Sequence, residues 1–237
     1  MKIKVIGSGS MWNEFNSACY MIDDDIMVDF PNGACKYLYR LNCVPNKINN
    51  ILITHFHGDH YFDLPFYILN KAKSDNKKIN IFCSQDGKDK INQIGNLAFP
   101  NSFDEACNKL DINYNFEDNF NVNGYNVYKY LVDHGRLKPA YGYILEKENI
   151  KIGFSGDTTL CDNLEYMANV CNYLFLDCML INASTKHMGI DKLEYLIDKY
   201  PSCKYVVSHL ENDTREKLKE LNYKNVIVPD DGYTIEL

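Results

Sequence analysis

The segment NNILITHFHGDHYFDL, residues 49–64, constrains the fold of this chain more than any other stretch. Its apolar run at 51–54 has the length and composition of a buried strand. Directly after this run come His55, His57, Asp59 and His60. Open α/β sheets bind ligands at the carboxyl ends of their strands, and imidazole and carboxylate groups are natural ligands of a borderline divalent metal such as zinc. The segment therefore predicts an α/β fold with a metal site at a strand end.

The spacing of these four side chains predicts two neighbouring metal positions. Alternate residues of an extended segment point to the same side, which aims His55 and His57 together. A turn at Gly58 then directs Asp59 and His60 elsewhere. The alternative is a surface loop whose histidines are hydrogen-bonded. Burying four such groups without a cation costs desolvation energy, and this favours the metal site.

The rest of the chain alternates between strand and helix patterns. Strands are predicted at 2–6, 18–22, 26–29, 51–54, 78–83, 120–122, 125–132, 141–154 (a hairpin), 173–179, 204–209, 225–229 and 232–237. Helices are predicted at 33–41, 61–73, 86–97, 160–170, 191–199 and 214–221. Several strands before each helix, in two successive halves, indicate two mixed sheets packed face to face with helices outside. Because no linker or repeat divides the chain, one domain over residues 1–237 is expected.

Composition and the chain start limit the classes of function. Lys plus Arg total 25 against 32 Asp plus Glu, and a net charge of −7 disfavours a broad, nonspecific grip on nucleic acid. No run approaches the roughly 20 apolar residues that cross a bilayer. The start MKIKVIGSGSMWNE reads as a strand entering a glycine turn, so a cytoplasmic location is expected. Nine cysteines without a CxxC pair indicate reduced thiols.

The segment THFHGDH resembles the H-x-H-x-D-H signature of the metallo-β-lactamase fold superfamily. Further stretches follow in the family's order: VDFPNG at 28–33, VDHG at 132–135, FSGDTT at 154–159 and VVSHL at 206–210. The resemblance implies a four-layer αββα sandwich of two mixed β-sheets. It also implies two divalent metal ions, Zn²⁺ in the first place, with Mn²⁺ or Fe as alternatives.

The same resemblance implies the ligand set. The first metal would be held by His55, His57 and His134, and the second by Asp59, His60 and His209, with Asp157 bridging both. Taken singly, His134 could be a surface histidine and Asp157 a helix cap, although Thr158 or Thr159 suits the cap better. His209 ends a predicted strand just as His55 follows one, which favours a ligand.

Three other residues have open roles. Asp29 and Thr54 are expected either to orient the ligand imidazoles or to serve the structure alone. Cys178 could be a thiol ligand or nucleophile, but a buried small residue is the preferred interpretation.

His187, in KHMG, resembles the non-ligand histidine of one subgroup, the tRNA 3′-processing nucleases and their small-molecule phosphodiesterase relatives. An imidazole there could hydrogen-bond a phosphoryl oxygen or protonate the leaving alkoxide, a step that phosphate esters require and thioesters do not. The resemblance therefore implies a dinuclear phosphodiesterase that uses a metal-bridging hydroxide. Asp59 would also orient that hydroxide by accepting its hydrogen bond.

The fold allows several substrate classes, and two features of the sequence narrow the choice. The tRNA nucleases of this subgroup carry an inserted glycine- and proline-rich basic arm, and the sequence contains no such stretch. With the acidic charge, this favours a cyclic nucleotide or other small phosphodiester, and an RNA end remains open. The alternatives are a glyoxalase-like thioesterase or lactonase on the same metal site and a non-catalytic metal-binding protein. Relatives of this kind imply a homodimer.

Overall fold

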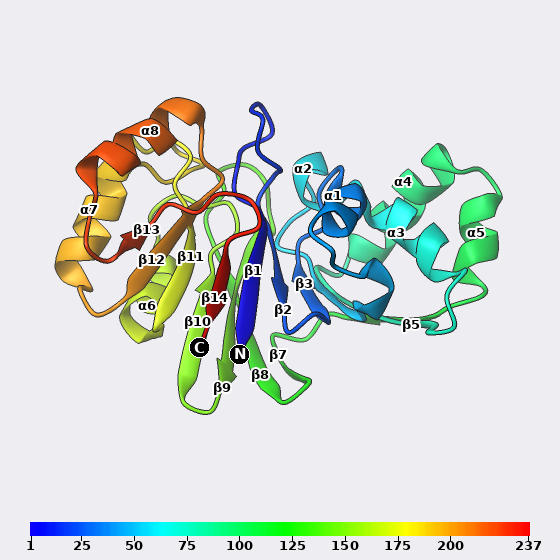
Figure 1. Cartoon of the computed structure of the whole chain (residues 1–237). Helices are drawn as coiled ribbons and strands as arrows, with labels where there is room; N and C mark the ends of the chain where they lie inside the picture. Colours follow the sequence, from blue (N-terminus) through cyan, green and yellow to red (C-terminus); the bar gives the residue numbers. More distant parts are fainter. The chain divides into compact units, whose positions relative to one another are not determined.

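In the computed structural model, which describes all 237 residues, the chain forms two compact units. Unit 1 comprises Met1–Gly7, Asn16–Phe116 and Asp231–Leu237, and unit 2 comprises Ser8–Phe15 and Glu117–Asp230. Each unit contains one seven-stranded mixed sheet (Figure 1). The two sheets are thus as predicted, but the units are not two successive halves, because unit 1 contains both chain ends. The single-domain organisation stays a prediction.

The sheet of unit 1 has the order β14-β1-β2-β3-β4-β5-β6. Its strands are β1 (Lys2–Gly7), β2 (Cys19–Ile22), β3 (Ile26–Val28), β4 (Asn50–Leu52), β5 (Lys78–Phe82), β6 (Asp111–Asn115) and β14 (Thr234–Glu236). From β3 to β6 the neighbours are parallel, so their carboxyl ends share one edge. Residues that follow β3 and β4 are therefore brought together at that edge.

The helices of unit 1 cover an apolar sheet face. They are α1 (Ala34–Arg40), the 3₁₀ turn η1 (Pro45–Lys47), α2 (Gly58–Tyr61), α3 (Leu64–Lys71), α4 (Gly87–Ala98) and α5 (Ser102–Cys107). Alternate strand residues such as Ile79 and Ile81 pack with Leu38, Tyr67 and Phe103 of the helices in one buried cluster. This face follows from the period-2 pattern of the strands.

The predicted helix at 61–73 is wrong as a single element. The structure ends α2 at Tyr61 and begins α3 at Leu64. Pro65 lies in the first turn of α3, where its missing N–H removes no helical hydrogen bond. A proline one turn further into a continuous helix would break a hydrogen bond, so the chain starts a new helix here.

The two chain ends close the sheet of unit 1. Strand β14 pairs antiparallel with β1, and the Met1 amino group donates to the Leu237 carbonyl oxygen at 2.9 Å. Both end markers lie beside each other in Figure 1. The last predicted strand thus becomes an edge strand of the first sheet.

The sheet of unit 2 has the order β13-β12-β11-β10-β9-β8-β7. Its strands are β7 (Asn119–Val122), β8 (Tyr125–Leu131), β9 (Tyr141–Lys147), β10 (Ile150–Phe154), β11 (Tyr173–Asp177), β12 (Lys204–Ser208) and β13 (Val226–Ile227). The predicted turn at Asn123-Gly124 is confirmed, with positive φ at both residues, as a two-residue hairpin favours. Strands β10 to β13 are parallel.

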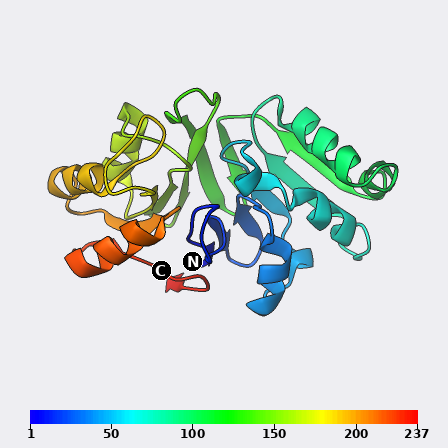
Figure 2. The ribbon, with the colours of Figure 1, turned by 90° about the horizontal axis from the view of Figure 1, so that it is seen from above.

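Three helices, α6 (Asp162–Val170), α7 (Ile190–Lys199) and α8 (Asn212–Leu221), complete unit 2. They pack on one face of the sheet, where Leu174, Leu176, Tyr205 and Val207 alternate along two strands (Figure 2). Cys178 is fully buried in this cluster, which confirms its interpretation as a core residue. No helix in the structure has the length and apolar character needed to cross a bilayer.

Candidate metal centre

The first set of candidate ligands lies in unit 1, after the carboxyl end of β4. His57 is the residue before α2, and Asp59 and His60 lie in the first turn of this helix. His55 Nε2 and His57 Nδ1 are 3.1 Å apart, and His60 Nε2 is 3.8 Å from Asp59 Oδ2. His55, Asp59 and His60 are buried, and His57 is half-buried. The structure therefore brings together all four residues of the HFHGDH segment that the sequence singles out.

Asp29 and Thr54 hold two of these imidazoles. Asp29 Oδ2 accepts from His60 Nδ1 at 2.8 Å and from the Thr54 hydroxyl at 2.7 Å. The Thr54 oxygen lies 3.1 Å from His55 Nδ1 and, having given its proton to Asp29, can only accept there. Both rings thus carry their proton on Nδ1, which leaves the Nε2 lone pairs available to a metal. Asp29 does this from a left-handed backbone conformation, φ 61°, next to the end of β3.

Burial raises the pKa of Asp29, while His60 and the Thr54 hydrogen bonds act in the opposite direction. Burial has the larger effect, so the pKa of Asp29 stays above its ordinary value. The hydrogen bonds from Thr54 and His60 offset part of the cost of burying the carboxylate.

The second set lies in unit 2. His134 follows β8, Asp157 follows β10 and His209 follows β12, strands that run in one direction, so all three side chains meet at one edge. Asp157 Oδ2 is 3.3 Å from His209 Nε2 and 3.9 Å from His134 Nε2. His134 Nδ1 donates to the Lys186 carbonyl oxygen at 2.9 Å, which again leaves Nε2 as the donor atom for a metal.

Burial lowers the pKa of His134, against the opposite effect of Asp157. A neutral imidazole is the form that binds a metal. His209 occupies a left-handed conformation with φ 58°, a strained backbone of the kind found at functional sites.

His187 lies beside this second set. Its Nδ1 is 2.9 Å from Asp177 Oδ2 and 3.9 Å from Asp157 Oδ2, and its ring stacks on His209 with centroids 5.2 Å apart. Burial lowers the pKa of His187, but the charge and hydrogen bond of Asp177, with Asp157, outweigh it and hold the pKa above its ordinary value. His187 is therefore disposed to carry a proton.

Asp177 is the functional candidate that sequence reasoning missed. It is the last residue of β11, is buried, and also accepts from the Thr158 backbone N–H at 3.0 Å. The available signal was its place near the end of the apolar strand predicted at 173–179, in the same half of the chain as Asp157 and His209.

The interpretation of Thr158 or Thr159 as a helix cap is wrong. Helix α6 begins at Asp162 with Cys161 at its cap position and no side-chain cap. Thr158 instead donates from its backbone to Asp177, and the Thr159 hydroxyl donates to the Ser184 carbonyl oxygen at 2.8 Å. Both threonines brace the loops around Asp157 and His187.

The donor chemistry of each set suits a divalent ion. Unit 1 contributes three imidazoles and a carboxylate, and in unit 2 the ligand atoms of Asp157, His187 and His209 lie within 4.8 Å of one another. Buried imidazole nitrogens oriented by second hydrogen bonds are typical of zinc sites. The side chains present therefore fit a metal of this class.

Solved structures resemble the whole chain. The metallo-β-lactamase fold protein YhfI from Bacillus subtilis superimposes with a TM-score of 0.78 at 15% identity, covering 99% of both chains. The short form of human tRNase Z gives a TM-score of 0.76 at 18% identity, covering 100% of this chain and 99% of the other. The α/β metallo-β-lactamase fold predicted from the sequence is confirmed.

Curated relatives carry the name ribonuclease Z. The protein of Pyrococcus abyssi is 30% identical over 133 residues, which cover 54% of this chain and 41% of the relative. That of Methanococcus maripaludis is 26% identical over 154 residues, covering 62% and 49%. The chain thus spans less than half the length of these curated relatives. They bear out the resemblance to the tRNA 3′-processing nucleases.

A protein family also matches most of the chain. The family described as "Anti-Pycsar protein Apyc1" matches residues 1–228 of this chain. The match includes every candidate ligand and both His187 and Asp177. This chain belongs to the anti-Pycsar protein Apyc1 family.

Proposed function

We propose that this chain is a metal-dependent phosphodiesterase acting on a small phosphodiester, with cyclic nucleotides as the preferred class. The observation that carries the proposal is His187, held by Asp177 beside the candidate ligands Asp157 and His209. A diester with an alkoxide leaving group needs a proton donor at that place, and a thioester does not. Because the chain belongs to the family described as "Anti-Pycsar protein Apyc1", it is also proposed to act against Pycsar.

The proposed ligand set assigns both clusters to one dinuclear centre. His55, His57 and His134 would hold one ion and Asp59, His60 and His209 the other, with Asp157 shared. The support is the resemblance together with the orientation of the imidazoles by Asp29, Thr54 and the Lys186 carbonyl. Bound divalent ions, Zn²⁺ in the first place and Mn²⁺ or Fe as alternatives, supply a nucleophile from water at neutral pH and neutralise phosphoryl charge.

The chain's own residues divide the remaining work. His187 gives a proton from Nε2 to the leaving oxygen, because its Nδ1 proton is engaged by Asp177. Asp177 keeps the ring oriented and stabilises its charged form. Asp59 accepts a hydrogen bond from the attacking water and directs it. Each of these roles uses a side chain whose hydrogen-bonding capacity suits it.

A small diester is proposed ahead of RNA because the net charge is −7 and no basic arm interrupts the sequence. An RNA end is the second substrate class, supported by the ribonuclease Z relatives. A thioesterase or lactonase and a non-catalytic metal-binding protein are the alternatives. A homodimer and a cytoplasmic location stay predictions.

The test compares two leaving groups in metal-replete protein and in His187→Ala with matched metal content. We expect hydrolysis of 3′,5′-cyclic nucleotides to fall by about 10²–10⁴-fold in the variant. Hydrolysis of bis-p-nitrophenyl phosphate should fall far less, because p-nitrophenolate departs without a proton. Cleavage of thioesters or lactones, with no phosphodiester hydrolysis by the metal-loaded protein, would overturn the proposal.

A further inference from the structure

We propose that Trp12 is a stacking platform for the nucleobase of the substrate. The inference rests on the proposed nucleotide phosphodiesterase activity and deepens it by naming the part of the substrate that the chain would recognise. Trp12 is a large, solvent-exposed aromatic side chain, and the polar side chains of its loop anchor that loop to the rest of unit 2.

Trp12 is the single tryptophan of the chain, and 77% of its surface is exposed. Its neighbour Met11 is 47% exposed. Tryptophan is mostly buried in folded proteins, because leaving so much apolar area in water forgoes a large hydrophobic gain. Tryptophan is enriched at interfaces, so an exposed tryptophan beside an exposed methionine on a well-anchored segment is a candidate contact surface.

The loop Ser8–Phe15 is anchored to the segment that follows β12, and both belong to unit 2. Gly9 forms a parallel bridge with Leu210, whose carbonyl oxygen also accepts from Asn13 Nδ2 at 2.6 Å. The Ser10 hydroxyl donates to Glu211 Oε1 at 2.8 Å, and Asn212 Nδ2 donates to Glu14 Oε2 at 3.0 Å. Polar side chains on both sides of Met11 and Trp12 thus face residues 210–212.

The base of the loop is equally well held. Arg215 donates to the Ser8 hydroxyl at 2.9 Å, and its guanidinium lies 3.8 Å from the centre of the Phe15 ring. Gly9 leaves no room for a side chain, since a Cβ atom there would lie 2.4 Å from Asn13 Oδ1. Such packing fixes the backbone under Trp12, which lowers the entropy cost of binding on its ring.

The anchored loop holds the backbone of Trp12 near the residue that follows the candidate metal ligand His209. Leu210 directly follows His209, and Ser10 and Asn13, both within two residues of Trp12, contact Leu210. From the span of an extended chain, the Trp12 Cα lies within about 10 Å of the Leu210 backbone. A nucleotide with its phosphate at His209 could therefore bring its base to this ring.

The surface beside the loop suits a neutral base better than a phosphate. Glu211 and Asn212, which bind the loop, also line a pocket of about 400 Å³ formed by residues 180–182 and 211–214. The pocket contains Glu211 and Asp213 and no lysine or arginine. Carboxylates repel a phosphate but accept hydrogen bonds from exocyclic amino groups of a base.

A nucleobase fits this patch better than a second copy of the chain does. A stable protein interface buries about 800 Å² on each partner, whereas the exposed apolar surface of this loop consists of Met11 and Trp12. A flat ring with one polar edge matches a single aromatic face beside hydrogen-bond acceptors. We therefore commit to the base and make self-association an outcome of the test.

Because Trp12 is the only tryptophan, its fluorescence reports on this site alone. We would titrate metal-loaded His187→Ala protein, in which turnover is slow, with 3′,5′-cyclic nucleotides, with a short single-stranded RNA and with ribose 5-phosphate. We expect both base-containing ligands to change the emission and ribose 5-phosphate to leave it unchanged. The stronger of the two responses identifies the source of the base.

Calorimetry then measures how much the Trp12 ring contributes to the affinity for the nucleotide. In the same background, Trp12→Ala should raise the Kd for the nucleotide by about 5- to 30-fold, and Trp12→Phe should recover most of the affinity. The matched control is Leu97→Ala, at a residue that is 78% exposed in α4 of unit 1, and its Kd should not change.

Three results would overturn the inference: nucleotide that binds by calorimetry without altering the emission, an unchanged Kd in Trp12→Ala, or no binding of any base-containing ligand. A dimer that Trp12→Ala converts to monomer in light scattering would assign the residue to self-association instead. The proposed activity fails separately, by absence of phosphodiester hydrolysis in the metal-loaded wild type. Failure of the stacking inference is therefore distinguishable from failure of the proposed activity.

Discussion

His187 Nδ1 lies 2.9 Å from Asp177 Oδ2, at the carboxyl end of β11. The hydrogen bond leaves Nε2 of His187 for the proposed proton transfer and places a negative charge behind the ring. A carboxylate in this position is a positioning residue: it orients the proton donor without touching the reacting atoms. The role of His187 in the proposed reaction therefore depends on Asp177.

Asp177→Asn should lower kcat for cyclic nucleotides by about tenfold or more, because an amide stabilises the protonated imidazole less than a carboxylate does. KM should change little. The informative measurement is the parallel rate with bis-p-nitrophenyl phosphate, which should be nearly retained. Equal losses on both substrates would assign Asp177 a structural role only.

Asp157→Asn should lower the metal content of the chain. We expect two ions per chain in the wild type and one or fewer in the variant, measured by elemental analysis after dialysis, because an amide is a weaker and uncharged ligand. Chelation of the wild type should lower Tm, since a ligand present at 100 times its Kd stabilises by about 2.7 kcal/mol. Asp133→Asn, at an exposed neighbouring loop position, is the control and should keep the full metal content.

Asp29→Ala should weaken metal binding by about 10- to 100-fold, because it removes the acceptor that orients His60 and the Thr54 hydroxyl. Competition with a chromophoric chelator measures this affinity. Thr54→Val keeps the Asp29–His60 contact and should show a smaller loss. An affinity unaltered in Asp29→Ala would mean that the ligand segment holds its geometry without the aspartate.

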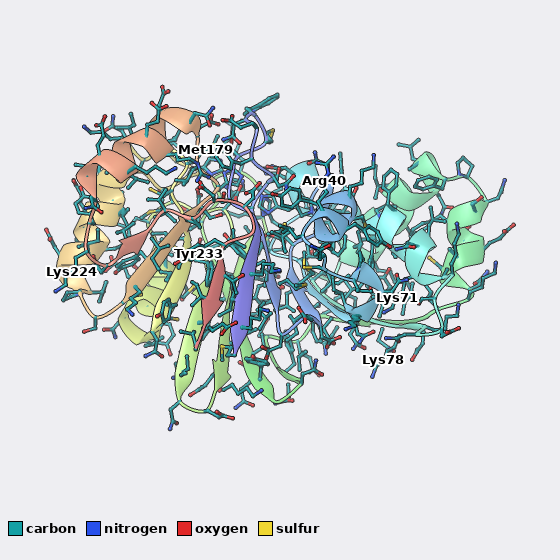
Figure 3. The ribbon with its side chains drawn as sticks, in the orientation of Figure 1. Arg40, Lys71, Lys78, Met179, Lys224 and Tyr233 are labelled. Carbon is teal, nitrogen blue, oxygen red and sulfur yellow. The ribbon has the colours of Figure 1, made fainter.

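Lys71→Met tests the stability of unit 1 apart from the metal centre. The Lys71 ammonium group (Figure 3) is buried and donates to the carbonyl oxygens of Asn46 and Ile48 and to Asn49 Oδ1, at 2.6 to 2.9 Å. Losing these donors from a buried place should lower the free energy of unfolding by about 2–4 kcal/mol. Urea unfolding measures it, with Lys73→Met, an exposed position, expected within about 0.5 kcal/mol of the wild type.

Cys203 should make the protein less stable in alkali. Burial raises the pKa of its thiol from 9.0 to about 12, so above pH 9 the unfolded chain loses this proton while the folded one keeps it. The free energy of unfolding therefore falls as the pH rises above 9, by about 2 kcal/mol between pH 9 and 10.5. Urea unfolding at pH 8 and 10.5 should therefore show a smaller alkaline loss in Cys203→Ala. An equal loss in both proteins would exclude this thiol as a source.

Local patterns predicted most of the elements. Strands β4 and β11 each contain an apolar run, and α7 has an apolar stripe at helical spacing. Each element can therefore be identified as strand or helix from its own residues, without knowledge of what it packs against. The failures occurred where a local pattern was insufficient. The helix predicted at 61–73 is interrupted at residues 62–63, just before Pro65. The pattern does not predict α5, because its six residues are too short for a clear period.

The sequence by itself determined the α/β fold class and the candidate ligands of the HFHGDH segment, because a metal site demands specific side chains in a spacing that local geometry explains. The other candidate ligands came from the resemblance to a known family. His55, His57, Asp59 and His60 follow one strand and can be recognised from one segment. Only the tertiary structure decided which side chains support them. Asp29 meets Thr54 because β3 and β4 are parallel neighbours. Asp177 meets His187 because the loop after β11 folds back, with a bridge between Leu180 and Gly189. Strand order is set by packing over the whole sheet, which no single segment of the sequence contains.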